Sequence, residues 1–96
     1  MPYHFYILEC TGSHFYIGSC KNLDQRFKAH SQNIGAEFTK RYKPIRIAYH
    51  EIFPTRAEAM AREAQVKKWS QAKKQALIAG NMKRLKQLSE SHDQRF

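Results

Sequence analysis

The sequence predicts an α+β, or mixed α/β, fold in which a small sheet is flanked by helices. Residues 3–10 and 14–18 are rich in aromatic and β-branched side chains and flank a Thr-Gly-Ser turn, which predicts a β-hairpin. Residues 45–53 alternate as a third strand, and helix-capping signals precede and follow that strand. With 96 residues, the chain has material for one domain with a single core.

The three-residue turn fixes which residues of the hairpin face each other. It places Tyr6 across from Gly18 and Leu8 across from Tyr16, with all four side chains on one face of the sheet. Tyr6 and Tyr16 are then diagonal neighbours, so two phenol rings should lie close together.

The first helix is expected over residues 23–31, with Asn22 as its N-cap. Arg26 and His30 lie one turn apart on this helix, so they can address one site together. Residues 32–44 are expected to form an irregular basic loop. This loop is marked by Asn33, Gly35 and Pro44.

Three further helices are expected after the third strand. Thr55 and Glu58 form a capping box for a helix that runs to about residue 69. Ser70 caps the next helix, which ends near residue 78, where Gly80 suits a left-handed position past the helix end. The last helix should run from residue 81 to about residue 88, followed by a polar tail that frays.

The charge balance favours a polyanionic partner. Seventeen Lys and Arg residues against eight Asp and Glu residues give a formal net charge of +9 and a pI near 9.8. Nucleic acid is favoured over a membrane, because no segment approaches the ~20 apolar residues of a spanning helix. The alternative is that the charge only keeps a small protein in solution.

The two cysteines, Cys10 and Cys20, make no disulfide framework. Without a recognisable secretion signal, both thiols should stay reduced, as in the cytoplasm. Neither belongs to a Cys-x-x-Cys pair, and the five histidines offer no spacing for a zinc site. We therefore expect a cytoplasmic protein with two structural cysteines.

Five sequence elements resemble the signature of one nuclease family. Residues 5–7 and 15–18 are similar to the two halves of the GIY-YIG motif. Arg26 follows in a segment similar to the family's D/N-L-x-x-R helix, with His30 one turn later. Glu63 stands in an Ala-x-x-x-Glu motif, as the family's metal-binding glutamate does. The chain therefore resembles the GIY-YIG nucleases, in particular their small stand-alone bacterial members.

The resemblance covers about residues 3–78. It implies a GIY-YIG domain over residues 1–80, with a three-stranded antiparallel sheet flanked by helices, and leaves residues 81–96 as a C-terminal basic helix with a frayed tail. Two positions depart from the pattern. His4 stands where the first motif usually has glycine, and Asn81 cannot be aligned with the late asparagine of several members.

The resemblance also implies a set of catalytic residues. Tyr6, alone or paired with Tyr16, is the general base that takes a proton from the attacking water. Arg26 forks onto the phosphate oxygens, and His30 binds the same phosphate or relays a proton. Glu63 holds one Mg²⁺ or Mn²⁺, because hard cations take oxygen ligands.

The same residues also have simpler interpretations. Each tyrosine can be a hairpin aromatic whose hydroxyl finds water, and His30 can be a half-buried helix residue. Glu63 can be a surface residue that pairs with Lys67 one turn away, a contact worth only about 0.3–0.5 kcal/mol. From the residues alone, these alternatives stay open.

Two basic groups form the candidate nucleic-acid surface, one in and after the loop and one around the turn between two later helices. Their members are Lys40, Arg41, Lys43, Arg46, Lys67, Lys68, Lys73 and Lys74. If about four to six of them reach phosphates, binding should weaken with salt at a log-log slope of about −0.9 per contact. The alternative is that several are simply solvated.

These observations predict a metal-dependent DNA endonuclease that hydrolyses phosphodiester bonds and acts on branched, nicked or distorted DNA in repair or recombination. The alternative is a non-catalytic or cryptic nucleic-acid-binding module of the same fold, for DNA or RNA. A third possibility is that the last helix recruits a protein partner. The sequence predicts no oligomeric state.

Overall fold

Three strands and five helices make up the part of the chain that the computed structural model describes, residues 2–32 and 36–93. The elements in chain order are β1 (Tyr3–Cys10), β2 (His14–Cys20), α1 (Leu23–Ser31), α2 (Glu37–Arg41), β3 (Pro44–Phe53), α3 (Arg56–Lys67), α4 (Gln71–Ala79) and α5 (Met82–Asp93). All strand pairs are antiparallel, in the order β2-β1-β3. The predicted α+β fold with a three-stranded antiparallel sheet is confirmed.

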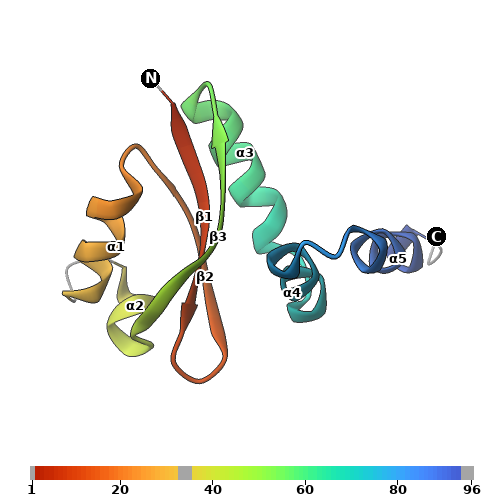
Figure 1. Ribbon diagram of the computed structural model, residues 1–96, viewed down its shortest axis with the longest axis horizontal. Coiled ribbons are helices and arrows are strands. Elements are labelled where there is room, and N and C mark those ends of the chain that lie inside the picture. Colours follow the sequence, from red (N-terminus) through yellow and green to blue (C-terminus); the bar gives the residue numbers. More distant parts are fainter. Residues whose placement is uncertain (1, 33–35, 94–96) are drawn as a thin grey trace.

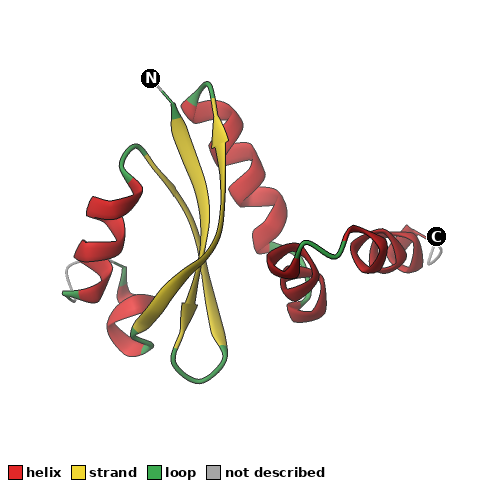
Figure 2. Cartoon of the chain, in the orientation of Figure 1, coloured by secondary structure: helices red, strands yellow, loops and turns green. Residues whose placement is uncertain are grey.

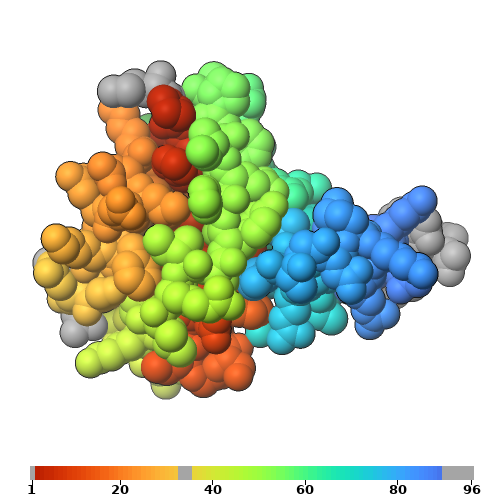
Figure 3. Space-filling model, viewed as in Figure 1, coloured from red at the N-terminus to blue at the C-terminus, as the bar shows by residue number. Residues whose placement is uncertain are grey.

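The sheet lies between two helical layers (Figures 1 and 2). Helices α1 and α2 lie on one side of it, and α3 and α4 lie on the other. Helix α5 follows α4 and projects away from the sheet, so the molecule has an extension at one end (Figure 3). Strand β2 is an edge strand, and α3 contacts it from one side of the sheet.

The hairpin has the predicted register. Tyr6 pairs with Gly18 and Leu8 pairs with Tyr16. The turn between β1 and β2 needs two left-handed residues, Gly12 at φ 74° and Ser13 at φ 60°. This turn therefore fixes the alignment of every residue pair along the hairpin.

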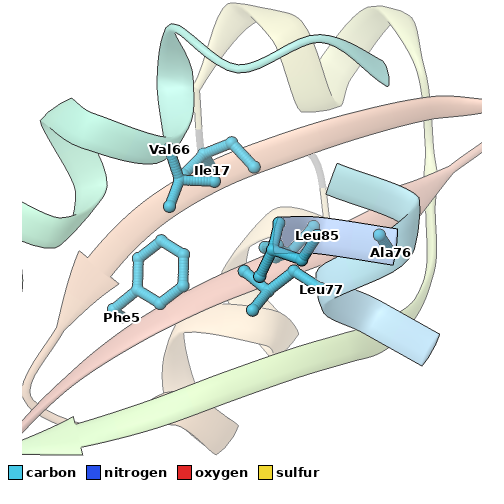
Figure 4. Close-up of a cluster of buried hydrophobic side chains, with 7 residues drawn as sticks. Phe5, Ile17, Val66, Ala76, Leu77 and Leu85 are labelled. Carbon is cyan, nitrogen blue, oxygen red and sulfur yellow. The ribbon is translucent and has the colours of Figure 1, made fainter. Parts of the chain in front are cut away.

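Alternation along the strands sends side chains into two separate cores, one on each face of the sheet. Figure 4 shows the core on the α3 and α4 side, where Phe5 and Ile17 meet side chains from three helices. Those helical members are Val66, Ala76, Leu77 and Leu85. The other core, on the α1 and α2 side, is formed by Tyr6, Leu8, Cys10 and Cys20. Each fully buried large apolar side chain contributes about 1.5–3 kcal/mol.

The predicted caps start the helices as expected. The side chain of Asn22 accepts from the Gln25 amide at 3.0 Å, and Thr55 accepts from the Glu58 amide at 3.3 Å. Gly80 ends α4 in the left-handed conformation at φ 70°. Local capping chemistry therefore explains where these helices begin and end.

Two expectations were wrong. Residues 37–41 form helix α2 within the segment expected to be irregular, because Phe38 and Tyr42 lie four residues apart and pack together on the second core. The expected fraying from Ser89 does not occur over residues 89–93, where α5 continues. The loop markers Asn33 and Gly35 and the end of the tail, 94–96, lie outside the described residues.

Two further features concern the cysteines and the apolar character of the helices. Both cysteines are buried and free, as expected. Over residues 2–32 and 36–93, none of the helices has the length and apolar character needed to cross a bilayer.

Candidate active site

The Tyr6 hydroxyl lies over the edge strand. Tyr6 belongs to the central strand β1, and Gly18 stands directly across from it on β2. A β-carbon built at Gly18 would lie 2.5 Å from the Tyr6 hydroxyl oxygen. Glycine is therefore required at this position, since any side chain would displace the phenol.

A chain of hydrogen bonds leads away from this hydroxyl. The Tyr6 oxygen lies 3.1 Å from Nε2 of His30, and Nδ1 of His30 lies 2.7 Å from the Thr39 hydroxyl. The Thr39 hydroxyl donates to the carbonyl of Ala36 at 3.0 Å, so it can only accept from His30. The imidazole therefore carries its proton on Nδ1, and in its neutral form accepts the Tyr6 proton at Nε2.

The electrostatics keep both ends of this contact neutral. Burial, aided by the nearby Tyr16, raises the pKa of Tyr6 well above 10.0, although the Arg26 charge opposes the shift. Burial and the same Arg26 charge lower the pKa of His30 below 6.5. Arg26 therefore does not ionise Tyr6, and the phenol can lose its proton only by passing it to a neighbour such as His30.

Three rings crowd together at this position. Tyr16 has its ring centroid 4.9 Å from that of His30 and 6.3 Å from that of Tyr6, as expected for diagonal neighbours. His30 and Tyr6 are each only 1% exposed, so neither side chain is open to a phosphate in this arrangement. Of the two roles expected for His30, only the proton relay fits this burial.

Arg26 occupies the open side of the site. It is exposed on α1 and lines a cavity of about 190 Å³ together with Cys20, Gln25 and Ala29. Its charge acts on Tyr6, Cys20 and His30. A guanidinium at this place is free to fork onto an anion beside the phenol.

Glu63 reaches the same edge strand from the opposite face of the sheet. Its Oε1 accepts from the Ser19 hydroxyl at 2.7 Å, and Ser19 is the residue after Gly18, so it points to the α3 side. Its Oε2 lies 2.7 Å from the Lys67 ammonium. The carboxylate is 20% exposed, and its charge contributes to raising the pKa of Tyr6.

From the sequence we expected Tyr6, Arg26 and Glu63 to surround one shared ion-sized space, and the structure does not have this arrangement. The helices do not enclose one shared space on one face. Instead, Tyr6 lies in the core on the α1 side of the sheet, and Glu63 bonds to Ser19 of β2 on the α3 side. The pairing of Glu63 with Lys67, expected under the simpler interpretation, is also present.

The donor set suits a hard divalent cation. Among the described residues, His, Cys, Asp and Glu side chains nowhere gather in threes as a ready-made metal centre. Glu63 offers one carboxylate, flanked by the Ser19 hydroxyl and already bearing one cation, Lys67. Mg²⁺ is commonly held by one or two carboxylates, with waters and substrate phosphates completing its shell. The residues at the edge strand fit this chemistry.

Several of the candidate nucleic-acid-binding residues already interact with other side chains of the protein. Lys40 pairs with Glu37 at 3.3 Å, and Arg46 pairs with Glu9 at 2.7 Å. Lys73 lies over the ring of Trp69, with its ammonium 4.2 Å from the ring centroid. The other candidates are placed as follows: Arg41, Lys43 and Lys68 are exposed, Lys74 is half-buried, and Lys67 is paired at the site.

Sequence reasoning missed two residues of the site. Thr39 orients His30, and Ser19 holds Glu63. Alternation along β2 could have placed Ser19 on the α3 face, but nothing in the sequence pairs Thr39 with His30. Asn81, which could not be aligned, accepts from the Arg84 amide at 3.0 Å and is the N-cap of α5.

Comparison with known proteins identifies the family. The sequence profile of the GIY-YIG catalytic domain matches residues 2–76. The chain belongs to the GIY-YIG family. The matched segment contains Tyr6, Tyr16, Arg26, His30 and Glu63 and ends before α5, so the last helix lies beyond the part shared with the GIY-YIG domain.

Relatives of this GIY-YIG chain are small bacterial proteins. A UPF0213 protein of Bacillus pumilus is 36% identical over 76 residues, which cover 79% of this chain and 78% of the relative. The UPF0213 protein SSP2268 of Staphylococcus saprophyticus is 35% identical over 77 residues, 80% of this chain and 94% of that one. Neither name assigns an activity.

Two solution NMR structures share the fold. The UPF0213 protein BH0048 from Bacillus halodurans gives a TM-score of 0.53 at 37% identity, covering 82% of this chain and 84% of that chain. The protein EF2693 from E. faecalis gives a TM-score of 0.57 at 32% identity, covering 85% and 88%. The chain therefore resembles these proteins over most of its own length and most of theirs.

Proposed function

We propose that this protein is a divalent-metal-dependent endonuclease that hydrolyses phosphodiester bonds in DNA. The observation that supports it most is the relay from Tyr6 through His30 to Thr39, whose first two members feel the charge of the exposed Arg26. A buried tyrosine hydroxyl needs a hydrogen-bond partner in any case, but here the partner is a neutral histidine whose free nitrogen is set to accept the proton. Such an alignment is what a phenol needs in order to act as a base near neutral pH.

The proton steps follow from the hydrogen bonds. The attacking water gives a proton to the Tyr6 oxygen as the Tyr6 proton passes to Nε2 of His30, which becomes an imidazolium held by Thr39. Because Tyr6 is only 1% exposed, the water reaches its oxygen when the half-buried ring of Tyr16 beside it moves aside. The resulting hydroxide attacks phosphorus, and the bond from phosphorus to the 3′ oxygen breaks as that oxygen takes up a proton from solvent.

Charge developing on the phosphoryl oxygens is met from the two faces of β2. Arg26 forks onto these oxygens on one side. Glu63, steadied by Ser19, would hold Mg²⁺ or Mn²⁺ on the other side. Such an ion would neutralise the phosphoryl charge and stabilise the leaving oxygen.

The substrate we propose is branched, nicked or otherwise distorted DNA, as in repair or recombination in the cytoplasm. The chain has a net charge of +9, and a basic surface of this kind contacts the phosphate backbone, which is the same whatever the base sequence. The alternative is a cryptic binding module for DNA or RNA. Some basic residues are exposed and others are paired within the protein, and such a surface is compatible with either function.

Cleavage assays decide between these two functions. Purified protein is incubated with Mg²⁺ or Mn²⁺ and labelled duplex, nicked, flap and four-way substrates. We expect wild type to cut at least one substrate, Glu63→Ala to stop cleavage and Tyr6→Phe to lower the rate about 10²-fold or more. Binding of every substrate with no cleavage under any condition would select the binding module.

A further inference from the structure

Both oxygens of the Glu63 carboxylate already have partners on the protein. Ser19 donates to Oε1 at 2.7 Å and the Lys67 ammonium lies 2.7 Å from Oε2. Lys67 follows Glu63 by one helical turn, so its ammonium can reach the carboxylate without distorting α3. Lys67 therefore stands against the oxygen that a cation bound by Glu63 would use.

We propose that Lys67 is a tethered competitor for the divalent cation: it occupies Glu63 in the metal-free protein and must leave for the ion to bind. This inference rests on the proposed function, because it takes Glu63 as the metal ligand. Under the simpler interpretation, Lys67 only forms a surface ion pair. Under this proposal, Lys67 lowers the affinity of Glu63 for the metal ion.

The strength of the ion pair suits this role. Lys67 is 53% exposed, and ion pairs of exposed side chains are weak, so a divalent ion can displace the ammonium. A fully buried pair would instead resist exchange, because its broken partner would stay uncompensated. Ser19 remains on the other oxygen and keeps the carboxylate oriented during the exchange.

The pair also has an effect before metal arrives. A bare carboxylate at the margin of β2 would repel an approaching phosphate. Lys67 neutralises this charge in the metal-free protein, while a divalent ion takes over the task when bound. The same helical turn thus keeps the DNA-facing edge from becoming negative in both states.

A magnesium titration without DNA tests the inference. Binding of Mg²⁺ is followed by the NMR chemical shifts of the Ser19 and Glu63 amides in wild type, Lys67→Met, Lys67→Arg, Lys68→Met and Glu63→Gln. Lys67→Met should bind Mg²⁺ about two- to fivefold more tightly, the ratio that matches the strength of an exposed pair. Lys67→Arg keeps the competing charge and should bind like wild type.

Lys68→Met is the matched control. It removes the same charge from the neighbouring exposed residue, which does not contact Glu63, so Mg²⁺ affinity should change by less than about 1.5-fold. Equal tightening in Lys67→Met and Lys68→Met would reduce the effect to net charge and overturn the inference.

The remaining outcomes separate the inference from the proposed function. If Glu63→Gln abolishes Mg²⁺ binding but Lys67→Met binds no more tightly than wild type, Glu63 is the ligand and Lys67 is not a competitor. If Glu63→Gln binds Mg²⁺ as wild type does, the ion is not held at Glu63, and the proposed metal-dependent mechanism fails with it.

Discussion

The Tyr6 hydroxyl passes over Gly18 so closely that a β-carbon there would lie 2.5 Å from the hydroxyl oxygen and 2.6 Å from the ring carbon bearing it. In the second half of the GIY-YIG motif, Gly18 therefore matters as well as Tyr16, because it has no side chain that would displace Tyr6. The Tyr6 phenol belongs to the central strand. It extends over the edge strand only because Gly18, directly across from it, has no side chain.

Gly18→Ala should destabilise the protein and misplace Tyr6. Overpacking of this kind costs about 1–3 kcal/mol, measurable as a lower free energy of unfolding in denaturant. In a Tyr6→Leu background the ring is gone, so adding the same methyl group should cost much less. Equal costs in both backgrounds would show that the phenol is not what demands glycine.

Thr39→Val should disturb the His30 tautomer. The valine has nearly the same shape but no acceptor for the Nδ1 proton, so a buried donor is left unpaired at a cost of about 1–3 kcal/mol. Nitrogen chemical shifts of the imidazole should show Nδ1 protonated in wild type and a mixture of tautomers in the variant. Thr39→Ser retains the hydroxyl and should preserve the wild-type pattern; an unchanged tautomer in Thr39→Val would contradict the assignment.

Stability should rise with pH through the titration of His30. Burial lowers its pKa in the folded protein below the usual 6.5, so the unfolded chain binds the proton more readily. The full contribution is present above pH 6.5 and is lost as pH falls through the lower, folded pKa.

Denaturant unfolding between pH 5 and about 7 measures this dependence. The slope of unfolding free energy against pH should be smaller in His30→Gln than in wild type. His50→Gln removes an exposed imidazole as the control. An identical slope in His30→Gln would mean that His30 is not buried in its neutral form.

Salt dependence should distinguish the free from the paired basic residues. Among the described residues, no carboxylate lies within ion-pair distance of Lys43 or Lys68, whereas Arg46 is held by Glu9. Replacing Lys43 or Lys68 with Gln should reduce the log-log salt slope of DNA binding by about 0.9 each. Arg46→Gln should change the slope less, and the measurement is fluorescence anisotropy of labelled DNA between low and moderate salt.

The last helix should contribute to the core although the matched family domain ends before it. Leu85 is 9% exposed and packs with Leu77, while Met82 on the same helix is 67% exposed (Figure 4). Leu85→Ala should cost about 2–5 kcal/mol in unfolding experiments. Met82→Ala is the control, with an expected cost below about 0.5 kcal/mol; equal small effects would make residues 81–96 an independent appendage, as the domain division at residue 80 predicted.

The hairpin could be predicted in detail because its register depends only on local turn length. Caps are equally local, which is why Asn22, Thr55 and Ser70 start helices where expected. Helix α2 escaped notice because five residues carry no clear periodicity and its cap, Ala36, makes no side-chain hydrogen bond. It is held by packing of Phe38 against the second core, which sequence patterns do not report.

The sequence predicted which residues are members of the candidate site better than it predicted how those residues are arranged. Spacing placed Tyr6 near Tyr16 and Arg26 near His30, since each pair lies within one local element. That Glu63 meets the edge strand through Ser19 depends on how α3 crosses the sheet, 44 residues farther along the chain. Long-range contacts of this kind are decided by tertiary packing.

The turn at residues 11–13 has an influence far beyond its own surface position. Gly18 and Ser19 are consecutive, and their side-chain positions point to opposite faces. If β2 shifted by one residue relative to β1, Ser19 would lie beneath the Tyr6 phenol and Gly18 would face Glu63. The Tyr6 side and the Glu63 side of the candidate site would then be disrupted together. A change of one residue in the length of this loop would therefore act like two mutations in the candidate site, while leaving every candidate residue in the sequence.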